Sequence, residues 1–115
     1  MNFTHTADIN GTYLQGTITT DYDTLVAVFG QPDYTPTDAG NKTDAEWTLC
    51  FSDGTVATIY NYKNGPNYCG PQGTPVKSIT KWNIGGTKTL ALHRVGDLIE
   101  EAQACASIYA SLSRP

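Results

Sequence analysis

Three tyrosines and one lysine near the middle of the chain are the residues whose types and spacing best suit ligand binding. Tyr60, Tyr62 and Tyr68 lie on or just after a predicted strand, and Lys63 follows Tyr62 directly. Flat rings stack on nucleotide bases, and a lysine beside them can meet a phosphate. We therefore predict a site for a flat, negatively charged ligand, to which Trp82 on the next strand adds a ring. The alternative is that the strand aromatics only fill the core.

A second candidate lies where a predicted strand ends and the last helix begins. Gly85 and Gly86 let the backbone turn, Thr87 and Lys88 open the helix, and Asn83 stands at the end of the strand. Free amides, the positive end of the helix dipole and a lysine together favour an anion such as phosphate. The spacing is not that of a P-loop. The alternative is that the glycines only form a tight turn.

Catalytic and metal chemistry are less well represented. His5 and His93 are the two histidines, and neither has a cysteine or acid at ligand spacing, so we expect no metal and no cofactor. Asp44 and Glu46 fall on one side of a strand and are candidates for an acid–base pair, although such acids are more often solvated. No motif pairs a nucleophile with a base. We expect a binding protein and not an enzyme.

The composition sets limits on the class of protein. The chain has 115 residues, of which 39% are hydrophobic and 16% charged, which fits one globular domain over residues 1–115. A formal charge of −4 and a pI near 4.8 argue against general nucleic-acid or membrane-surface binding. No apolar run is long enough to cross a bilayer, and the first residues do not resemble a signal peptide. We expect a cytoplasmic location.

The three cysteines, Cys50, Cys69 and Cys105, are far apart and are expected to be free thiols. Cys50 alternates with apolar residues on a predicted strand, and Cys105 lies on an apolar helix stripe. Both are predicted to be core residues. Cys69 lies in a loop rich in glycine and proline and is predicted to be exposed.

A β-hairpin over residues 44–63 is the element that must position the tyrosines. Asp53-Gly54 predicts a two-residue type I′ turn, because that turn needs positive φ at both central positions. Side chains alternate between the two faces of a strand, so the turn also fixes which residues share a face. The predicted cross-strand pairs are Phe51 with Val56, Leu49 with Thr58, and Trp47 with Tyr60.

The other elements follow from periodicity. Residues 1–11 are expected to be loose, and residues 12–19 form a strand with Leu14 and Ile18 on one face and a bulge or close crossing at Gly16. A helix over 21–29 begins at a Thr20 cap and ends at Gly30. Loops at 33–43 and 64–77 flank the hairpin, and a strand over 78–84 ends at the glycine pair. The buried stripe of this first helix comprises Tyr22, Leu25, Val26 and Phe29.

The last helix, over residues 89–112, carries a long apolar stripe and would be about 36 Å long. The strands would reach only about 23 Å. Because the overhanging part of the stripe needs cover, we predict a homo-oligomer, most simply a two-fold dimer. The stripe comprises Leu92, Val95, Leu98, Ile99, Ala102, Cys105, Ala106 and Tyr109. The element order β-α-β-β-β-α predicts an α+β fold, a small antiparallel sheet with helices on one face.

Several segments resemble a family of small bacteriophage accessory proteins. They are Asp-Ala-Glu-Trp at 44–47, the run from Phe51 to Lys63, and Trp-Asn-Ile-Gly-Gly at 82–86; Leu14 to Gly16 and the helix end at 29–32 are also similar. The likeness covers most of the chain. In the family pattern a histidine precedes Ile-Gly-Gly, where this chain has Asn83, which favours binding over catalysis.

The resemblance implies an accessory protein that acts in the cytoplasm of an infected bacterium. Small phage proteins of this kind often counter host immunity, some by sequestering nucleotide signals. Together with the predicted sites, this gives the hypothesis of an anti-defence sponge that binds a host nucleotide messenger without cleaving it; the link is an analogy. The alternative is a protein-binding inhibitor of a host defence or metabolic enzyme, acting through a sheet edge or the apolar helix.

Overall fold

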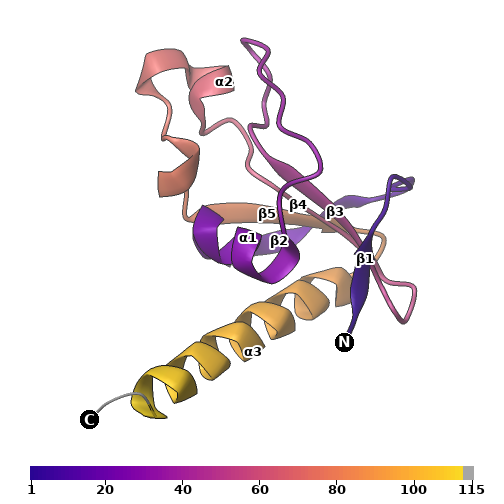
Figure 1. Cartoon of the computed structure of the whole chain (residues 1–115). Coiled ribbons are helices and arrows are strands. Elements are labelled where there is room, and N and C mark those ends of the chain that lie inside the picture. The colour runs from indigo at the N-terminus through magenta and orange to yellow at the C-terminus, as the bar shows by residue number, and fades with distance from the viewer. Residues whose placement is uncertain (113–115) are drawn as a thin grey trace.

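The chain folds into one antiparallel sheet with helices on one face, as predicted for an α+β protein (Figure 1). The computed structural model describes residues 1–112, except the side chains of residues 109–111. Within residues 1–112 no helix has both the length and the apolar character needed to cross a membrane. In chain order the elements are β1 (Phe3–His5), β2 (Tyr13–Thr19), α1 (Tyr22–Phe29), β3 (Glu46–Phe51), β4 (Val56–Tyr60), α2 (Pro66–Cys69), η1 (Gly70–Gln72), η2 (Val76–Ser78), β5 (Lys81–Gly86) and α3 (Leu90–Leu112).

The sheet has the strand order β1-β3-β4-β5-β2, and α1 and α3 pack against the same face of it. Trp47 and Trp82 form the centre of the core, fully buried and in edge-to-face contact with ring centroids 5.6 Å apart. Burial of large rings removes the most apolar surface from water, so this contact is a main source of stability. The rest of the buried core comprises Leu25, Phe29, Ala45, Leu49, Phe51, Ala57, Ile59, Ile79, Ile84, Ala91, Val95 and Ile99.

The β3–β4 hairpin exists as predicted, but its predicted register is wrong by one residue. Trp47 pairs with Ile59 and Leu49 with Ala57. Only Gly54 has positive φ in the turn, at 88°, so the loop has three residues with the glycine in the left-handed position, instead of the type I′ turn. One step of register exchanges the faces of β4, which places Ala57 and Ile59 in the core and Tyr60 on the opposite face.

Helix α1 begins and ends close to its predicted limits, but its cap is different. The Asp21 carboxylate accepts the amide of Thr24 at 2.8 Å, whereas the hydroxyl of Thr20, the predicted cap, is buried without a partner. Gly30 ends the helix with φ 85°, and its carbonyl accepts the indole N–H of Trp47 at 2.8 Å. The helix end is thereby fixed to the centre of the sheet.

The predicted loose N-terminus contains strand β1, which pairs with β3. Phe3 packs edge-on against Phe29, with ring centroids 5.4 Å apart. His5 is held by two acceptors, with Nδ1 2.8 Å from a carboxylate oxygen of Asp33 and Nε2 2.9 Å from the carbonyl of Phe29. A strand of three residues is too short to show a period, so these long-range contacts decide its structure.

Strand β2 has both features predicted at Gly16. A bulge lies between Leu14 and Gly16, and a side chain at Gly16 would collide with Leu92 of α3. The bulge inserts one residue into the alternation. The prediction that Leu14 and Ile18 share a face is therefore wrong: Leu14 lies with Thr17 on the face away from α3.

Strand β5 is shifted along the chain from its predicted range. It begins at Lys81 and includes both Gly85 and Gly86, which were predicted to end it. The glycines serve close packing, because a Cβ at Gly86 would overlap the side chain of Ala91 and one at Gly85 would overlap that of Thr58. Helix α3 can therefore start directly beneath the sheet.

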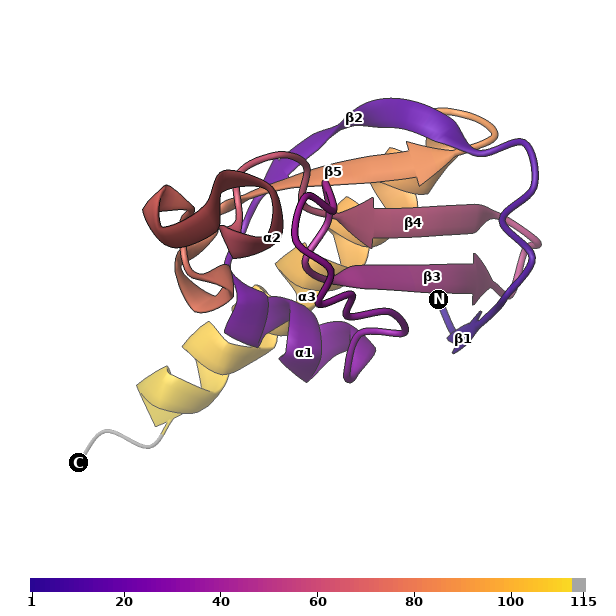
Figure 2. The same cartoon turned by 90° about the horizontal axis from the view of Figure 1, so that it is seen from above.

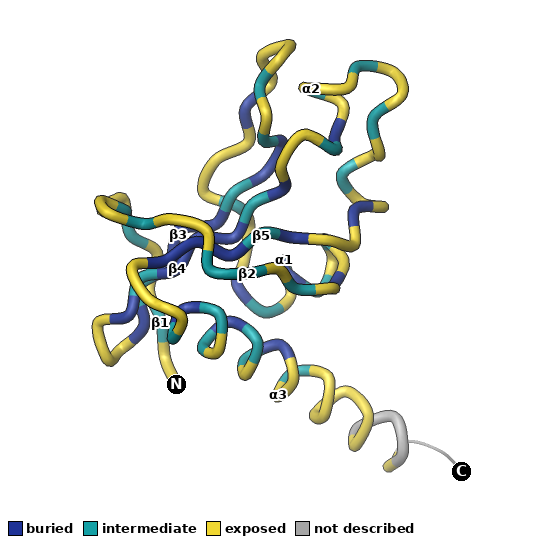
Figure 3. Tube along the Cα trace, turned by 180° about the vertical axis from the view of Figure 1, so that it is seen from behind, coloured by how far each residue is buried: buried dark blue, intermediate teal, exposed yellow. Residues whose placement is uncertain are grey.

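Helix α3 is buried only over its first half. Ala91, Val95 and Ile99 lie in the core, while Cys105 and Ala106 are exposed (Figures 1 and 3). The predicted burial of Cys105 is therefore wrong within one copy of the chain, because the helix runs past the end of the sheet. Its predicted stripe extends further to Tyr109, whose side chain is outside the described residues.

We expect opposite effects of alanine at two glycines, Gly86 on β5 and Gly96 within α3. Gly86→Ala should lower the free energy of unfolding by about 1–3 kcal/mol, since the new Cβ meets Ala91 and lies 3.1 Å from the carbonyl oxygen of Val56. Gly96→Ala should raise it by up to about 1 kcal/mol, because that position is helical and a Cβ there has open space. Urea denaturation measures both, and a gain for Gly86→Ala would contradict the assigned packing.

Candidate functional site

Figure 2 shows the strands side by side in the order β2, β5, β4, β3 and β1. The face of this sheet away from α3 carries a row of polar side chains. Register places Glu46 of β3 beside Tyr60 of β4, Tyr60 beside Asn83 of β5, and Asn83 beside Thr17 of β2. Side chains at one level of a sheet face lie within contact distance of their neighbours. Two predicted site residues, Tyr60 and Asn83, are thus brought together, and Glu46 and Thr17 join them.

Two groups of this row have perturbed acidities. Partial burial raises the pKa of the Tyr60 hydroxyl, while a hydrogen bond with Asn83 lowers it and the nearby acidic groups of Glu46 and Tyr62 raise it further. Burial raises the pKa of the Glu46 carboxyl, and the nearby carboxylate of Asp33 adds to this. Raised acid pKa values on a partly exposed surface are typical of functional sites, although structural networks also cause them.

A hollow of about 400 Å³ lies beside this row, where β5 begins. Tyr62 and Asn83, both predicted site residues, line it together with Lys81, Asn64, Thr17 and Leu14. A ring, an ammonium group and two side-chain amides offer stacking, charge and hydrogen bonds to one small molecule. The sequence did not predict Lys81 and Asn64 as site residues, because no local pattern shows that the start of β5 lies beside the end of β4.

Lys63 has an unusual backbone conformation next to this hollow. Its φ is 60°, which makes it the one residue other than glycine with positive φ in the described part of the chain. Its amide donates to the carbonyl of Lys42 at 2.8 Å, and its carbonyl accepts the thiol of Cys69 at 3.2 Å. The ammonium lies 5.3 Å from the ring centroid of Tyr62 and 5.5 Å from that of Tyr68. The predicted cluster of Tyr62, Lys63 and Tyr68 is therefore present.

The buried amide of Asn61 holds this segment in place. Its side chain is fully buried, and its oxygen accepts the amides of Asp44 at 2.7 Å and Ala45 at 3.1 Å. Its nitrogen donates to the carboxylate of Asp44 at 2.9 Å and to the side-chain oxygen of Asn64 at 3.0 Å. All four hydrogen bonds that an asparagine side chain can make are thus formed. Lys63 follows two residues later, so the backbone leading into it is held by these hydrogen bonds.

The predicted carboxylate pair is not formed. Asp44 lies inside the Asn61 network, and its second oxygen accepts the amide of Asn67 at 3.1 Å. Glu46 lies on the open face, where its charged neighbour is Asp33. Asp44 therefore acts as a structural acceptor for the loop after β4, and its partners do not include Glu46.

The remaining predicted site residues lie elsewhere. Trp82 is fully buried in the core on the helix side of the sheet. Because Tyr60 pairs with Asn83 and the strands run antiparallel, Tyr62 lies beyond one end of the sheet and Lys88 beyond the other, roughly 20 Å apart. Within one subunit the two predicted sites therefore do not form a single pocket. Gly85, Gly86 and Thr87 lie at or near the Lys88 end, with Gly85 covered by Thr58 and the Tyr60 ring.

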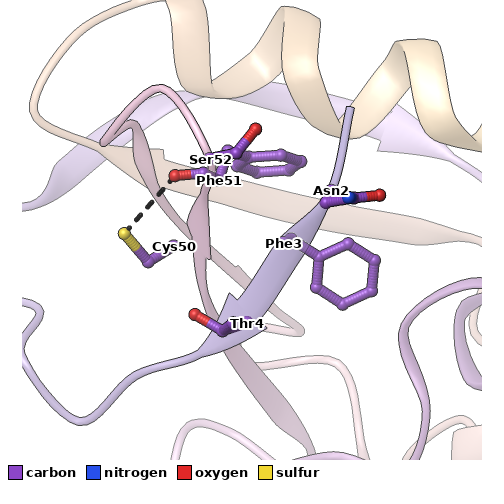
Figure 4. Close-up of a pocket in the computed structure, with 6 residues that line it drawn as sticks. All are labelled: Asn2, Phe3, Thr4, Cys50, Phe51 and Ser52. Atoms are coloured by element: carbon purple, nitrogen blue, oxygen red, sulfur yellow. Dashed lines mark hydrogen bonds between the residues drawn. The ribbon is translucent and has the colours of Figure 1, made fainter.

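Two other hollows offer fewer groups that could bind a ligand. One of about 120 Å³ lies between β1 and β3, where Cys50 is half-buried and its thiol is 3.6 Å from the carbonyl of Phe51 (Figure 4). The predicted full burial of Cys50 is wrong, because alternation places it on the open face. Cys69 is exposed, as predicted. A hollow of about 460 Å³ beneath α2 contains Asp44, which already serves the loop. In residues 1–112, no three metal-binding side chains gather in one place.

Comparisons with protein-family models, with curated protein sequences and with solved structures find no match to this chain.

The raised pKa of Glu46 can be tested by measuring how the stability of a Glu46 variant depends on pH. Because the folded state raises the pKa of Glu46 above its ordinary 4.5, the folded protein holds this proton more tightly, and stability falls as the pH rises through that range. Glu46→Gln should therefore be more stable than the parent near neutral pH, by roughly 0.5 kcal/mol for a partly exposed group. The difference should become small below about pH 3.5, where the Glu46 side chain is mostly neutral in both the folded and the unfolded protein. Urea denaturation at both pH values measures it, with exposed Glu101→Gln as the control.

Proposed function

We propose that this chain is a non-catalytic binding protein that sequesters a flat, negatively charged small molecule of nucleotide type. Its site comprises the hollow beside β5 and the adjoining cluster of Tyr62, Lys63 and Tyr68. The hollow, at about 400 Å³, has the volume of typical small-molecule sites. The groups around it are rings, amides, a hydroxyl and ammonium groups, which recognise a ligand but supply no activated nucleophile.

The conformation of Lys63 is the observation that carries this proposal. A left-handed backbone costs a residue with a side chain roughly 1 kcal/mol or more, and glycine would avoid that cost. A lysine at such a position retains a charged side chain at the expense of stability. The ammonium of this strained residue lies near two tyrosine rings, beside a hollow that contains a second lysine, Lys81. Strained residues of this kind gather at functional sites.

The ligand class follows from the same groups. Two ammonium groups, from Lys63 and Lys81, favour phosphate oxygens. The rings of Tyr62 and Tyr68 favour a planar base, and the amides of Asn64 and Asn83 offer donors and acceptors to a sugar or base edge. The resemblance to small phage accessory proteins supplies the setting that we propose for it: an infected bacterium, with a host immune nucleotide as the ligand.

Lys63→Gly should separate binding from stability. It should raise the free energy of unfolding by roughly 0.5–1 kcal/mol, because glycine accepts positive φ without strain. It should also weaken ligand binding by about ten-fold or more, because the phosphate loses an ammonium partner. Thermal shift with a panel of linear and cyclic nucleotides measures both effects.

Matched controls separate this result from general surface effects. Tyr62→Ala should weaken the same ligand, whereas Tyr13→Ala, at an exposed tyrosine on β2, should not. Lys88→Ala tests the separate anion site predicted at the start of α3 and should leave this ligand unaffected. A panel that never shifts the parent melting temperature, or a Lys63→Gly variant that binds as well as the parent, would contradict the proposal.

We also propose that the second half of α3 is covered by another copy of the chain. Ile108 and Leu112 are 61% and 80% exposed at the end of a helix whose first half is buried. Ile108→Asp should shift the protein to a monomer in sedimentation velocity, and Ser107→Asp, an exposed neighbour, should not. Leu98 is unsuitable for this test, because it packs on the core. A parent protein that is already monomeric would refute this interface.

A further inference from the structure

The outer edge of β2 is a long strand edge with little protection. No strand of residues 1–112 pairs with that edge, because β2 is last in the sheet order. Its seven residues, Tyr13–Thr19, include no charged side chain and no proline, the usual means of blocking an edge. The bulge between Leu14 and Gly16 interrupts the first half of the strand, and Gly16–Thr19 are regularly paired with β5. The edge therefore presents backbone donors and acceptors to a further strand.

A groove runs along this edge on the helix side. It has a volume of about 240 Å³ and lies between Ile18 and Thr19 of β2 and the middle of α3. Gly96 forms part of its wall, and a Cβ there would meet nothing within 4 Å. Glycine is unfavourable inside a helix. Its lack of a side chain at this position leaves open space beside the edge.

The groove has apolar and acidic parts. Ile18 and Ile99 supply the apolar surface, and Glu100 and Gln103 complete the lining. A lysine or arginine fits such a groove, because its methylene stem lies on apolar surface while its charged end reaches the carboxylate. The chain as a whole is acidic, with a net charge of −4, which also favours a basic partner.

The other side of the same edge opens into the 400 Å³ hollow, which Leu14 and Thr17 line. Side chains of an added strand alternate between the two faces, so one set would enter the groove and the other would lie near this hollow. A strand edge with side-chain pockets is the arrangement by which β-augmentation combines affinity with sequence preference.

We propose that the edge of β2 binds an extended segment of a partner protein, with a lysine or arginine of that segment placed in the groove between β2 and α3. A second copy of this chain fits less well. Pairing β2 with its own copy would bring no cation to Glu100, because β2 contains neither lysine nor arginine. The groove is separate from the Lys63 cluster, although the hollow that Leu14 and Thr17 line belongs to both proposals.

Two synthetic peptides test the proposal. Acetyl-Thr-Val-Thr-Lys-Thr-Val-Thr-amide should bind about ten-fold more tightly than the same peptide with glutamate in place of lysine, because only the first offers Glu100 a cation. Titration into isotopically labelled protein should shift the backbone amide resonances of Tyr13–Thr19 above all others. Glu100→Gln should remove most of the difference between the peptides.

Variants of Gly96 provide the steric control. Gly96→Phe should abolish binding of the lysine peptide by filling the groove, while Gly96→Ala should fold and bind. Lys63→Gly should leave peptide binding unchanged, which keeps this result independent of the nucleotide proposal. Equal affinity for both peptides, no binding at millimolar concentration, or resonance shifts away from β2 would overturn the inference. So would a dimer through β2 that the lysine peptide does not dissociate.

Discussion

The hydrogen-bond network of Asn61 is the constraint on which the rest of the candidate site depends. A buried amide that makes all four of its hydrogen bonds has one favourable orientation, because each lost bond leaves a polar group without water. This orientation ties the entry of β3 at Asp44 and Ala45 to the exit of β4 and to Asn64. The strained backbone of Lys63 lies next to these fixed points, and its ammonium lies near the two tyrosine rings.

The two faces of the sheet differ in polarity. The face toward α1 and α3 is almost entirely apolar, with two tryptophans in contact at its centre. The opposite face carries Glu46, Tyr60 and Asn83 in one row. Because the helices occupy only one side, the polar row can be partly buried by neighbours and still meet a ligand. Partial burial also raises the pKa values of Glu46 and Tyr60.

The two ends of the sheet differ in how they use glycine. Gly85 and Gly86 allow close approach of Thr58 and Ala91, so the fold itself requires them near the start of α3. At the other end of the sheet a residue with a side chain, Lys63, occupies a conformation that glycine would adopt more easily. The strained residue Lys63 and the close-packed glycines therefore lie at opposite ends of the sheet.

The sequence alone determined the elements whose signals are local. The alternation through 46–60, the helical spacing of Leu25 and Phe29 and the long stripe of α3 predicted the hairpin, both main helices and the α+β class. The neighbours Tyr62, Lys63 and Tyr68 were found for the same reason. Tertiary structure decided the register of the hairpin, in whose turn only Gly54 takes positive φ. It also decided which residues share the candidate site, because antiparallel pairing places Tyr62 and Lys88 at opposite ends of the sheet. Such choices depend on contacts between segments distant in sequence, which no short-range pattern encodes.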